Sequence, residues 1–577
     1  MEHSTHARPR ITAGALLVAI SSACVLVGVA RAVGSAWVTD DAFISFRYAQ
    51  NLVEGQGLVF NPGERVEGYT NFLWTAWSAV AIGAGLDPVR WALVWGVVAY
   101  AASIVLLAVH HAGLRGALSL SGATLPAGAI LAGLNEEWAR YATGGLETSA
   151  FAFLALVGFV LLAGRPEPRA RRLVAAGAVF ALTSMTRPDG VVLAAVAGAW
   201  VVAASEGSVG SRMRAAGLFG LGFAALWAPF TIVRVAYYGD FWPNIYHAKS
   251  AYLVWYAQGW QYLRLFLAKY WMLLASPALL ALGARSLRRL DGLGAWARQA
   301  LLAGALLVAY TFFVVRVGGD FMFGRLLVPT LPFWAVLFDL GTLGLARRRA
   351  LYWGASALLV LALLFTPSPI EGRQIVHGIA DEPRHYSREV MEQIDRQADV
   401  LRRFFEGLDV TVGFTGSEAR LVYRARVPRA IECETGLTDR AIARQSLERR
   451  GRPGHEKHAR LEYLVDERGT HFVFNRYAFK IIGAEGRLPF VPVDFGGVSG
   501  FLLHWDPELL AELSRRGAQV PDFPAALDRM IADLPRADLA RVARVYADLE
   551  RFYFDHVDDP SRRAPFVERL SREPVGQ

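Results

Sequence analysis

Apolar runs that are long enough to cross a membrane recur through the first two thirds of the chain. The first, ITAGALLVAISSACVLVGVARAV, would span about 30 Å of hydrocarbon as a helix that rises about 1.5 Å per residue. Hydrophobic residues make up 54% of the 577 residues, which is high for an ordinary soluble enzyme. The pattern therefore predicts a polytopic α-helical membrane protein, with further spans at 91–110, 120–134, 149–163, 173–186, 190–204, 215–235, 263–283, 299–315, 326–345 and 350–366.

One ambiguous stretch, NFLWTAWSAVAIGAG at 71–85, decides the predicted topology. If it crosses the membrane, the basic segments RPEPRARR, GARSLRRLDG and LARRR face outward; if it is a short re-entrant segment, they face the cytoplasm. The positive-inside rule favours the second alternative. We therefore expect eleven crossings, with the first run acting as a retained signal anchor whose N-terminus is cytoplasmic. The odd number of crossings places residues 367–577 on the outer face.

Charge and cysteine content exclude two classes of protein. The net charge is +9, but the basic residues fall between apolar runs as topology signals do, so nucleic acid is not an expected partner. Lysine occurs only at positions 249, 269, 457 and 480, which makes a lysine a stronger functional pointer than an arginine in this chain. Of the two cysteines, Cys24 lies in the first apolar run and Cys433 in the polar tail, so we expect no disulfide framework.

The segment TPSPIEGR, which follows Phe365, is a plausible domain boundary because its prolines and glycine interrupt the helical pattern. We expect a transmembrane domain over 1–366, with its first outer loop at 34–90, and an outer α/β domain over 367–577. Within the second domain, 385–407 is typical of an amphipathic helix and 526–553 of further helices. The segments VTVGFTG and HFVFN are typical of strands.

Asp40 and Asp41 follow the first span directly, in TDDAFISFRY. Carboxylates at this point often cap a helix, and that interpretation stays open. Adjacent helical positions diverge by about 100°, so the two side chains need not face one substrate. One of them could act as a general base while the other holds an acceptor hydroxyl or a divalent cation, Mg²⁺ or Ca²⁺, through oxygen ligation.

Five cations fall on the predicted outer side, against the positive-inside bias: Arg187, His247, Lys249, Arg316 and Arg325. Any one of them could simply extend from the membrane boundary into water. A phosphate group at the lipid surface would explain the whole set, because Arg binds phosphate through two parallel hydrogen bonds and Lys binds it as a point charge. Two classes of function fit this site: an enzyme that acts on a polyprenyl-phosphate substrate, or a transporter or flippase of lipid-linked sugars. The second class predicts polar residues deep within several helices, and the sequence has few of them.

The segment DDAFISFRYAQNLVEGQGLVFNPGERVEGYTNFLW resembles the first outer loop of the GT-C glycosyltransferases related to the mycobacterial terminal β-(1→2) arabinofuranosyltransferase. The motifs GGLETS, TRPDG, GGDFMFGRLLVP, GLTDRAIAR and GRPGHEKH are similar to motifs that occur in the same order in that family. The resemblance implies a GT-C fold in a bacterial plasma membrane, a polyprenyl-monophosphate sugar donor and catalysis on the periplasmic face. The implied reaction transfers a pentofuranose, D-arabinofuranose, to a cell-envelope glycan; another sugar and a surface glycan or protein acceptor are the alternatives.

The resemblance also implies roles for individual residues. The family's acidic pair falls on Asp40 and Asp41, which the resemblance assigns to catalysis; of the two, we expect Asp40 to be the base. We expect no cofactor beyond the divalent cation, Mg²⁺ or Ca²⁺, that this pair could hold. His455 and Lys457 are expected to close the site from the tail. Donor-phosphate or other substrate contacts are expected from Arg47, Glu67, Tyr69, Asn71, Glu147, Arg187, His247, Lys249, Arg316, Asp320, Arg325, His455 and Lys457.

Overall fold

The computed structural model describes residues 12–120, 122–163, 169–287, 293–415, 418–447, 450–474 and 491–572. The chain forms two compact units. Unit 1 comprises 1–42, 70–241 and 253–386, and unit 2 comprises 43–69, 242–252 and 387–577. The expected boundary at 366/367 differs from this division, because 367–386 packs with unit 1. Two short segments from the first two thirds of the chain belong to unit 2, and α2 (Asp41–Val53) begins in unit 1 and continues in unit 2.

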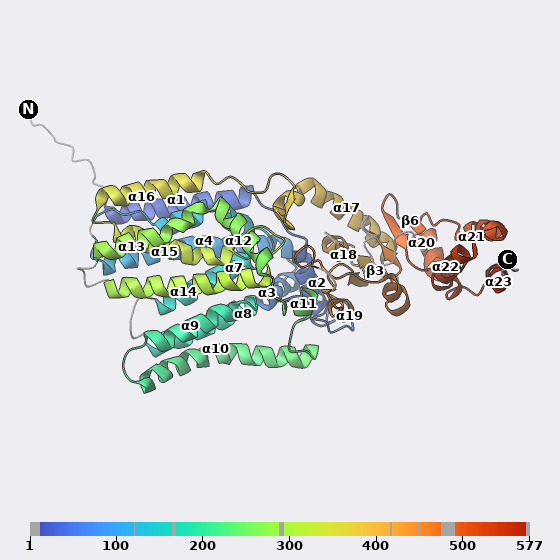
Figure 1. Cartoon of the computed structure of the whole chain (residues 1–577), viewed down its shortest axis with the longest axis horizontal. Coiled ribbons are helices and arrows are strands. Elements are labelled where there is room, and N and C mark those ends of the chain that lie inside the picture. Colours follow the sequence, from blue (N-terminus) through green and yellow to red (C-terminus); the bar gives the residue numbers. More distant parts are fainter. Residues whose placement is uncertain are drawn as a thin grey trace, which may run out of the picture. The chain divides into compact units, whose positions relative to one another are not determined.

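Unit 1 is a bundle of helices, whose long members run nearly parallel in Figure 1. The pair α8 and α10 and the pair α13 and α15 pack closely along their lengths. The helices of this unit are α1 (Ala13–Gly34), α3 (Phe72–Gly83), α4 (Pro88–Ala117), α5 (Ala127–Leu134), α6 (Glu136–Tyr141), α7 (Thr148–Leu162), α8 (Ala170–Thr186), α9 (Gly190–Ala204), α10 (Val209–Tyr238), α12 (Tyr256–Lys269), α13 (Ser276–Leu287), α14 (Leu293–Val317), α15 (Leu331–Gly344) and α16 (Arg349–Leu364).

The helices of unit 1 have the length and composition of membrane spans. Within the described ranges, four are long and apolar enough to cross alone, namely α1, α4, α10 and α14, and a bent pair of helices makes a fifth candidate. Five shorter apolar helices accompany them, beginning at Phe72, Thr148, Gly190, Val328 and Arg349. The coarser expectation of a helical protein with several membrane-length apolar segments is therefore confirmed. The number of eleven crossings stays a prediction.

Two of the expected spans differ from the helices that form. Over 120–134 the helix α5 begins only at Ala127 and has eight residues, about 12 Å at 1.5 Å per residue, because Pro126 precedes it and the chain before Pro126 is not helical. Over 263–283 the chain breaks after Lys269, and the two halves, α12 and the segment Trp271–Leu287, meet at 89°. At the break the buried Lys269 ammonium lies 2.7 Å from both Glu136 and Glu137, so an ion cluster occupies the place where a straight apolar helix was expected.

A five-stranded mixed sheet lies at the centre of unit 2. Its order is β4-β3-β5-β7-β6, with β3 parallel to both of its neighbours and the other pairs antiparallel. The expected strands VTVGFTG and HFVFN form as β3 and β5, and the expected amphipathic helix forms as α17 (Arg388–Phe405), although Asn475 lies outside the described residues. The strands are β3 (Thr411–Phe414), β4 (Arg429–Glu432), β5 (Phe472–Val473), β6 (Val491–Asp494) and β7 (Ser499–Leu502).

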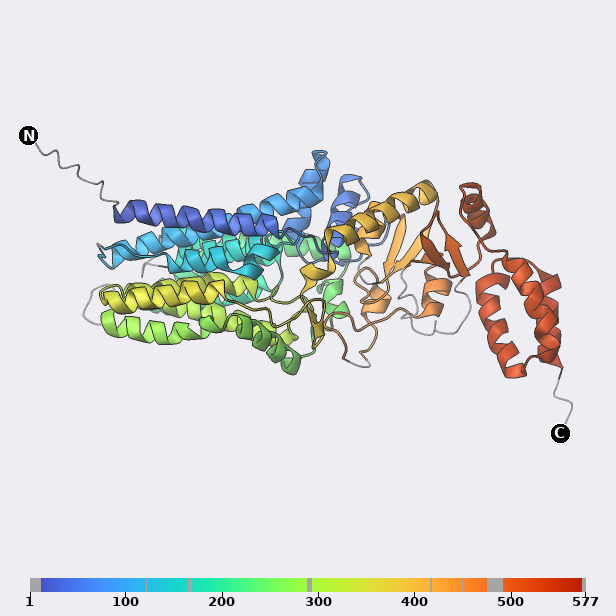
Figure 2. The same ribbon diagram turned by 90° about the horizontal axis from the view of Figure 1, so that it is seen from above.

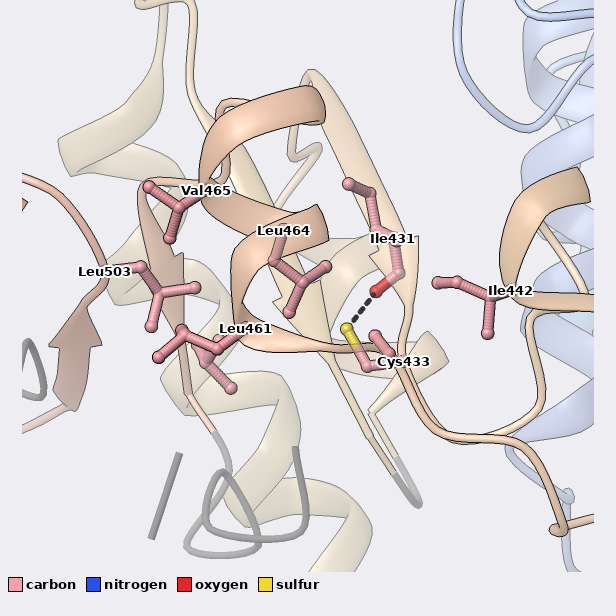
Figure 3. Packing of buried hydrophobic residues seen from close by; sticks show 9 residues of the cluster. Ile431, Cys433, Ile442, Leu461, Leu464, Val465 and Leu503 are labelled. Atoms are coloured by element: carbon pink, nitrogen blue, oxygen red, sulfur yellow. Dashed lines mark hydrogen bonds between the residues drawn. The ribbon is translucent and has the colours of Figure 1, made fainter. Parts of the chain in front are cut away.

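A buried cluster beside this sheet holds one of the two cysteines. Figure 3 shows Cys433 among apolar side chains, with its thiol donating a hydrogen bond to the Ile431 carbonyl oxygen at 3.3 Å. Burial raises the pKa of this thiol well above its ordinary value. Both cysteines are free. Cys433 therefore packs as a small apolar side chain, because a thiol kept neutral is a poor nucleophile and a poor metal ligand.

The C-terminal part of unit 2 consists of the helices α20 (Pro507–Arg515), α21 (Phe523–Asp533), α22 (Leu539–Leu549) and α23 (Pro560–Ser571). The helix α23 packs against both α21 and α22, in the red C-terminal region of Figure 2. The helices expected within 526–553 are thus confirmed. Each of the three begins with an aspartate whose carboxylate accepts a backbone N–H of the first turn, as Asp522, Asp538 and Asp559 do.

Three histidine rings lie close together, tilted relative to one another, where these helices follow the sheet. The His504 ring lies 4.7 Å from that of His471 and 4.6 Å from that of His556, and its Nδ1 donates to the Thr470 carbonyl oxygen at 3.0 Å. Burial and the two neighbouring imidazoles lower the pKa of His504 to about 4, and Asp506 opposes that shift.

The stability of this region is expected to fall as the pH drops from 6.5 towards 4. An unfolded His504 has its ordinary pKa near 6.5, so the unfolded state binds more protons in that interval and the free energy of unfolding falls by up to about 3 kcal/mol. Thermal unfolding at pH 7.5 and pH 5 measures the loss. His504→Asn, which keeps a donor for Thr470, should lose less between the two pH values; an equal loss in both proteins would contradict this role.

Candidate functional site

A network of two guanidinium groups and four carboxylates lies in unit 1. Its members come from the start of α2, the turn before α7, the end of α8 and the loop after α14. The distances between them range from 2.7 to 3.9 Å. The network consists of Asp41, Glu147, Arg187, Asp189, Asp320 and Arg325.

A glycine turn brings Glu147 to the start of α2. Gly145 has φ +80°, and it lies directly against Val38 and Ala42, on either side of the two aspartates. The Gly144 carbonyl oxygen accepts the Thr39 N–H at 3.1 Å, which ties the turn to the segment that carries Asp40 and Asp41. The motif GGLETS therefore brings Glu147 close to the segment that carries Asp41, although the two are far apart in sequence.

Gly145→Ala is expected to lower the free energy of unfolding by about 1–3 kcal/mol. The added Cβ would lie 2.9 Å from Val38 Cγ1 and 3.0 Å from Ala42 Cβ, at a φ that side chains rarely adopt. Thermal unfolding of the purified protein measures the effect. Gly144→Ala is the matched control, because its nearest neighbour, Trp37 Cζ2, is 3.3 Å away and the cost should be smaller. Equal melting temperatures for the wild type and Gly145→Ala would contradict this packing.

Glu147 is the residue on which the network converges. Its side chain is buried, and one carboxylate oxygen, Oε2, accepts the Asn71 Nδ2–H at 2.9 Å. The other oxygen, Oε1, lies 3.7 Å from Arg187 Nη1 and 3.9 Å from Arg325 Nη2. Asn71 is itself oriented by the Thr75 hydroxyl, which donates to its Oδ1 at 3.1 Å. Glu147 therefore lies close to both arginines, but it does not satisfy all the hydrogen-bond donors of either one.

Arg187 is held from the other side by Asp189. The two side chains form a bidentate pair, with Nε 3.0 Å from Oδ1 and Nη2 2.7 Å from Oδ2. The Tyr310 hydroxyl donates to the same Oδ2 at 2.6 Å, and the guanidinium lies over the Phe151 ring. Burial by itself would lower the pKa of Arg187, but the Asp189 carboxylate outweighs it, so the pKa is raised well above its ordinary value. Arg187 stays charged.

Arg325 is positioned by the loop GGDFMFGR. Its Nη1 lies 3.3 Å from Asp320 Oδ2 and 3.7 Å from Asp41 Oδ2. Two tyrosines fix the loop: the Tyr262 hydroxyl donates to the Met322 carbonyl oxygen at 2.9 Å, and the Tyr141 hydroxyl donates to that of Phe323 at 2.7 Å. Burial opposes charge on Arg325, yet the nearby carboxylates, Asp320 first, raise its pKa above the ordinary value.

Each arginine retains a buried N–H group without a hydrogen bond. These atoms are Nη1 of Arg187 and Nε of Arg325. A buried donor that lacks a partner costs free energy, so the pair favours an added oxygen ligand at this place. The arrangement can therefore hold an anionic oxygen at its arginines. The cluster also holds four carboxylates against two guanidinium groups, and a bound cation would reduce that excess of negative charge.

The two aspartates differ in exposure. Asp40 is 5% exposed, whereas the Asp41 side chain is 35% exposed and directs Oδ2 towards Arg325. Asp41 is also the first residue of α2, where a carboxylate is favoured by the helix dipole. Among the described residues, no group of three His, Cys, Asp or Glu side chains is arranged to hold a metal ion. The proposal that the pair binds a divalent cation stays a prediction.

The structure divides the predicted site residues between the two units. Unit 1 brings Asp41, Asn71, Glu147, Arg187, Asp320 and Arg325 together and also contains Asp40 and Arg316. Unit 2 contains Arg47, Glu67, Tyr69, His247, Lys249, His455 and Lys457.

In unit 2, Lys457 is buried and donates to two carbonyl oxygens, those of His247, at 2.7 Å, and of Ala443. Burial lowers the pKa of its ammonium. The Lys249 side chain packs over Gly454. Its Cε lies 3.4 Å from the position that a Cβ added to Gly454 would take. Two of the four lysines in the chain, Lys249 and Lys457, therefore lie in unit 2, together with His247.

Arg47, for which a substrate contact was predicted, makes structural contacts within unit 2. Its Nε donates to the Phe60 carbonyl oxygen at 2.7 Å, and its Nη2 donates to Asn61 Oδ1 and to the Pro428 carbonyl oxygen, both at 3.2 Å. Glu67 and Tyr69 are buried, and the Glu67 carbonyl oxygen accepts the Asn244 N–H at 3.0 Å.

Sequence reasoning missed one member of the network, Asp189, and the tyrosine that donates a hydrogen bond to it, Tyr310. Asp189 lies inside the motif TRPDG, where only the arginine was selected, although an acid two residues from a buried arginine was an available signal. Tyr310 is a phenol in the middle of an apolar run and was counted as part of a span. The Lys269 cluster was also missed, even though lysine is rare in this chain.

The proteins of known function that match this chain are glycosyltransferases. Both are named terminal β-(1→2)-arabinofuranosyltransferase, which confirms the resemblance drawn from the motifs. The protein from Corynebacterium glutamicum is 29% identical over 342 residues, covering 53% of this chain and 48% of its own length. That from Mycobacterium tuberculosis is 28% identical over 402 residues, covering 61% and 62%. The chain spans about half to three fifths of the length of these relatives.

Two kinds of solved structure are similar in arrangement. ArnT from Cupriavidus metallidurans bound to undecaprenyl phosphate is 14% identical with a TM-score of 0.49, over 74% of this chain and 87% of that one. An Archaeoglobus fulgidus oligosaccharyltransferase is 11% identical with a TM-score of 0.40, over 71% and 62%. Both TM-scores lie below 0.5, so the GT-C fold stays a prediction. No protein-family model matches the chain.

Proposed function

We propose that this chain is a membrane glycosyltransferase of the GT-C fold. It transfers a pentofuranose, D-arabinofuranose, from a polyprenyl-monophosphate donor to a cell-envelope glycan on the periplasmic face of the plasma membrane. The observation that carries the proposal is the partly exposed Asp41 carboxylate beside Arg325, in a network whose two arginines keep unused N–H donors, in a chain whose matching relatives are arabinofuranosyltransferases.

Asp41 is the proposed general base. A base must lie within hydrogen-bond reach of the acceptor hydroxyl, and Asp41 is the more exposed of the two aspartates. It would accept the hydroxyl proton as the acceptor oxygen attacks the anomeric carbon. Asp40, buried one residue earlier, supports the start of α2 in this scheme, which reverses the roles expected from the sequence.

Arg187 and Arg325 are the proposed phosphate ligands. As the bond between the anomeric carbon and the phosphate oxygen breaks, the leaving phosphate gains a negative charge. The free N–H groups, Nη1 of Arg187 and Nε of Arg325, would stabilise that charge, and fixed donors need no reorganisation when it appears. Asp189 and Asp320 keep the two guanidinium groups in place. The phosphate can then leave without being protonated.

A divalent cation at Asp40 and Asp41 is the alternative means of binding the phosphate. The excess of carboxylates over guanidinium groups supports it, and the oxygen ligands suit Mg²⁺ or Ca²⁺. Treatment of the purified protein with EDTA separates the two mechanisms. Transfer that survives EDTA assigns phosphate binding to the arginines, and transfer that is lost and then restored by Mg²⁺ or Ca²⁺ assigns a share of it to the metal.

A transfer assay tests the function directly. Purified full chain is mixed with synthetic polyprenyl-phosphoryl β-D-arabinofuranose and a short arabinofuranoside, and the product and its anomeric configuration are determined. We expect one added arabinofuranose. A β product from a β donor requires net retention and hence either a double displacement or front-face attack, whereas an α product indicates a single displacement. Absence of transfer from a folded protein that binds the donor would contradict the proposal.

A lipid-linked-sugar transporter is the second class considered, and it requires open polar groups along the helices. The buried polar groups at His111 have partners: Nδ1 lies 3.1 Å from Asp339 Oδ1, and Nε2 lies 3.0 Å from the Thr124 hydroxyl. Asp339 Oδ1 also accepts the Gly128 N–H. These contacts join helices to one another, which favours a structural role and supports the enzyme over the transporter.

A further inference from the structure

A cavity of about 370 Å³ with a mixed polar and apolar lining lies within unit 2. It is bounded by α2 and the loop after it, by the end of α17, and by the turn that follows α18 (Ala419–Arg424). Its volume falls in the range of small-molecule sites, roughly 300–1,000 Å³. The side chains that matter for its chemistry are Arg47, Gln50, Glu54, Phe405, Tyr423 and Arg426.

The lining has the composition of a site for a neutral polyol. Charged groups of both signs line the cavity, with guanidinium groups from Arg47, Arg402 and Arg426 and carboxylates from Glu54 and Glu406, so it offers donors and acceptors with one positive charge in excess. The Gln50 amide adds a donor, which is hydrogen-bonded to Glu54, and a carbonyl oxygen acceptor. The Tyr423 ring provides an apolar wall of the kind on which a sugar face can lie. A phosphate would meet Glu54, and a cation would meet the arginines, so a hydroxyl-rich ligand fits better than either ion.

The walls of the cavity are fixed by hydrogen bonds to the backbone. Arg47 is 6% exposed and binds two carbonyl oxygens and the Asn61 side chain, as described above. Asn51 Nδ2 donates to the carbonyl oxygens of Val59, at 2.8 Å, and Phe60, at 2.9 Å. These contacts join α2 to the loop that follows it. The site therefore exists before any ligand binds, which reduces the ordering cost of binding.

One residue at the rim has a strained backbone. Arg426 has φ +51° in the turn that ends α18, a conformation in which glycine is favoured and a side chain costs free energy. Its Nη1 lies 2.9 Å from Glu54 Oε1, so the ion pair joins the turn to α2 across the cavity wall. Arginine therefore occupies a position where glycine would cost less free energy. This indicates that the Arg426 side chain has a role that outweighs the backbone strain.

We propose that this cavity binds a neutral oligosaccharide, namely sugar residues of the acceptor glycan remote from the reacting hydroxyl. The acceptor role rests on the proposed function, whereas binding of a neutral sugar chain by unit 2 does not. Such a subsite would supply binding energy from non-reacting parts of the acceptor. It would also give the protein a preference for longer acceptors over single sugars.

Direct binding of an arabinofuranose tetrasaccharide to the full-length protein in detergent micelles tests the proposal, by isothermal titration calorimetry and by ligand-observed NMR. Arg426→Gly is the main variant: it removes the side chain and relieves the strain, so its melting temperature should equal or exceed that of the wild type. We expect the tetrasaccharide Kd to rise about tenfold in this variant, because a hydrogen bond to a charged group is lost. Arg429→Ala is the matched control. Arg429 is a similarly exposed arginine paired with Asp409 in unit 2, and it does not line the cavity.

The outcomes separate this proposal from the proposed reaction. Wild type and Asp41→Asn should bind the tetrasaccharide with equal Kd even though the second is expected to be inactive. A Kd unchanged by Arg426→Gly, or no binding by the folded wild type at millimolar tetrasaccharide, overturns the subsite. Tighter binding of an acidic oligosaccharide than of the neutral one also overturns it. Tetrasaccharide binding that Arg426→Gly weakens, in a protein that shows no transfer, would reject the reaction and retain the sugar site.

Discussion

Asp41→Asn is expected to lower the rate of transfer by about 10²–10⁴-fold, the contribution that a positioned general base makes. The amide keeps the size of the carboxylate but cannot accept the proton of the acceptor hydroxyl. Because Asp41 lies 3.7 Å from Arg325, and Arg325 remains paired with Asp320 at 3.3 Å, the guanidinium should stay in place. The loss should therefore appear in kcat, with the donor KM changed by much less.

Asp40→Asn is the comparison that distinguishes the two aspartates. Asp40 is buried, so its substitution should change the melting temperature more and the rate less than Asp41→Asn does. The measurement is initial rate against donor concentration for both variants, with circular dichroism to confirm folding. If Asp40→Asn abolishes transfer at an unchanged melting temperature while Asp41→Asn remains active, Asp40 is the base, as first expected from the sequence. If both variants retain the wild-type rate, the proposed site is wrong.

The sequence predicted the helical bundle because apolar periodicity and length decide which segments form membrane-length helices. The run 190–204, for example, forms exactly that helix, α9. It also predicted the α/β tail, since β3 and β5 are short apolar runs bounded by turn residues. It predicted that Asp41, Glu147, Arg187 and Arg325 belong to a site, from motifs with charges at the ends of apolar runs, and unit 1 brings these four together.

What the sequence did not predict depends on contacts between distant segments. The break after Lys269 follows from its pairing with Glu136 and Glu137, which lie about 130 residues earlier in a segment that no periodicity connects to it. The assignment of 43–69 and 242–252 to unit 2 depends on contacts such as Asn244 Nδ2 with the carbonyl oxygens of Gly436 and Leu437, both at 2.9 Å. Backbone carbonyl oxygens are present at every residue, so a pattern of side chains cannot identify such partners.

Asp189→Asn is expected to lower the free energy of unfolding by about 3–5 kcal/mol, because it removes the bidentate charge partner of the buried Arg187 guanidinium and leaves it only the more distant Glu147 carboxylate. Arg187→Met should cost less than this, since Asp189 keeps the hydrogen bond from the Tyr310 hydroxyl. The double variant Arg187→Met, Asp189→Asn should be more stable than the sum of the two losses predicts, by about 1–3 kcal/mol, because no uncompensated charge remains in it. Thermal and chemical unfolding in detergent measure all three.

The same variants report on donor binding. In Asp189→Asn the guanidinium loses the bidentate contact that orients it, so its free Nη1 no longer has a fixed direction and the donor KM should rise with a smaller change in kcat. Asp528→Asn is the matched control, since Asp528 also forms a two-point contact with an arginine, Arg562, but at an exposed position where little change in melting temperature is expected. If the loss in free energy of unfolding of the double variant equals the sum of the two single losses, the Arg187–Asp189 pair is not energetically coupled. An unchanged donor KM in Asp189→Asn would remove the reason for assigning the phosphate to Arg187.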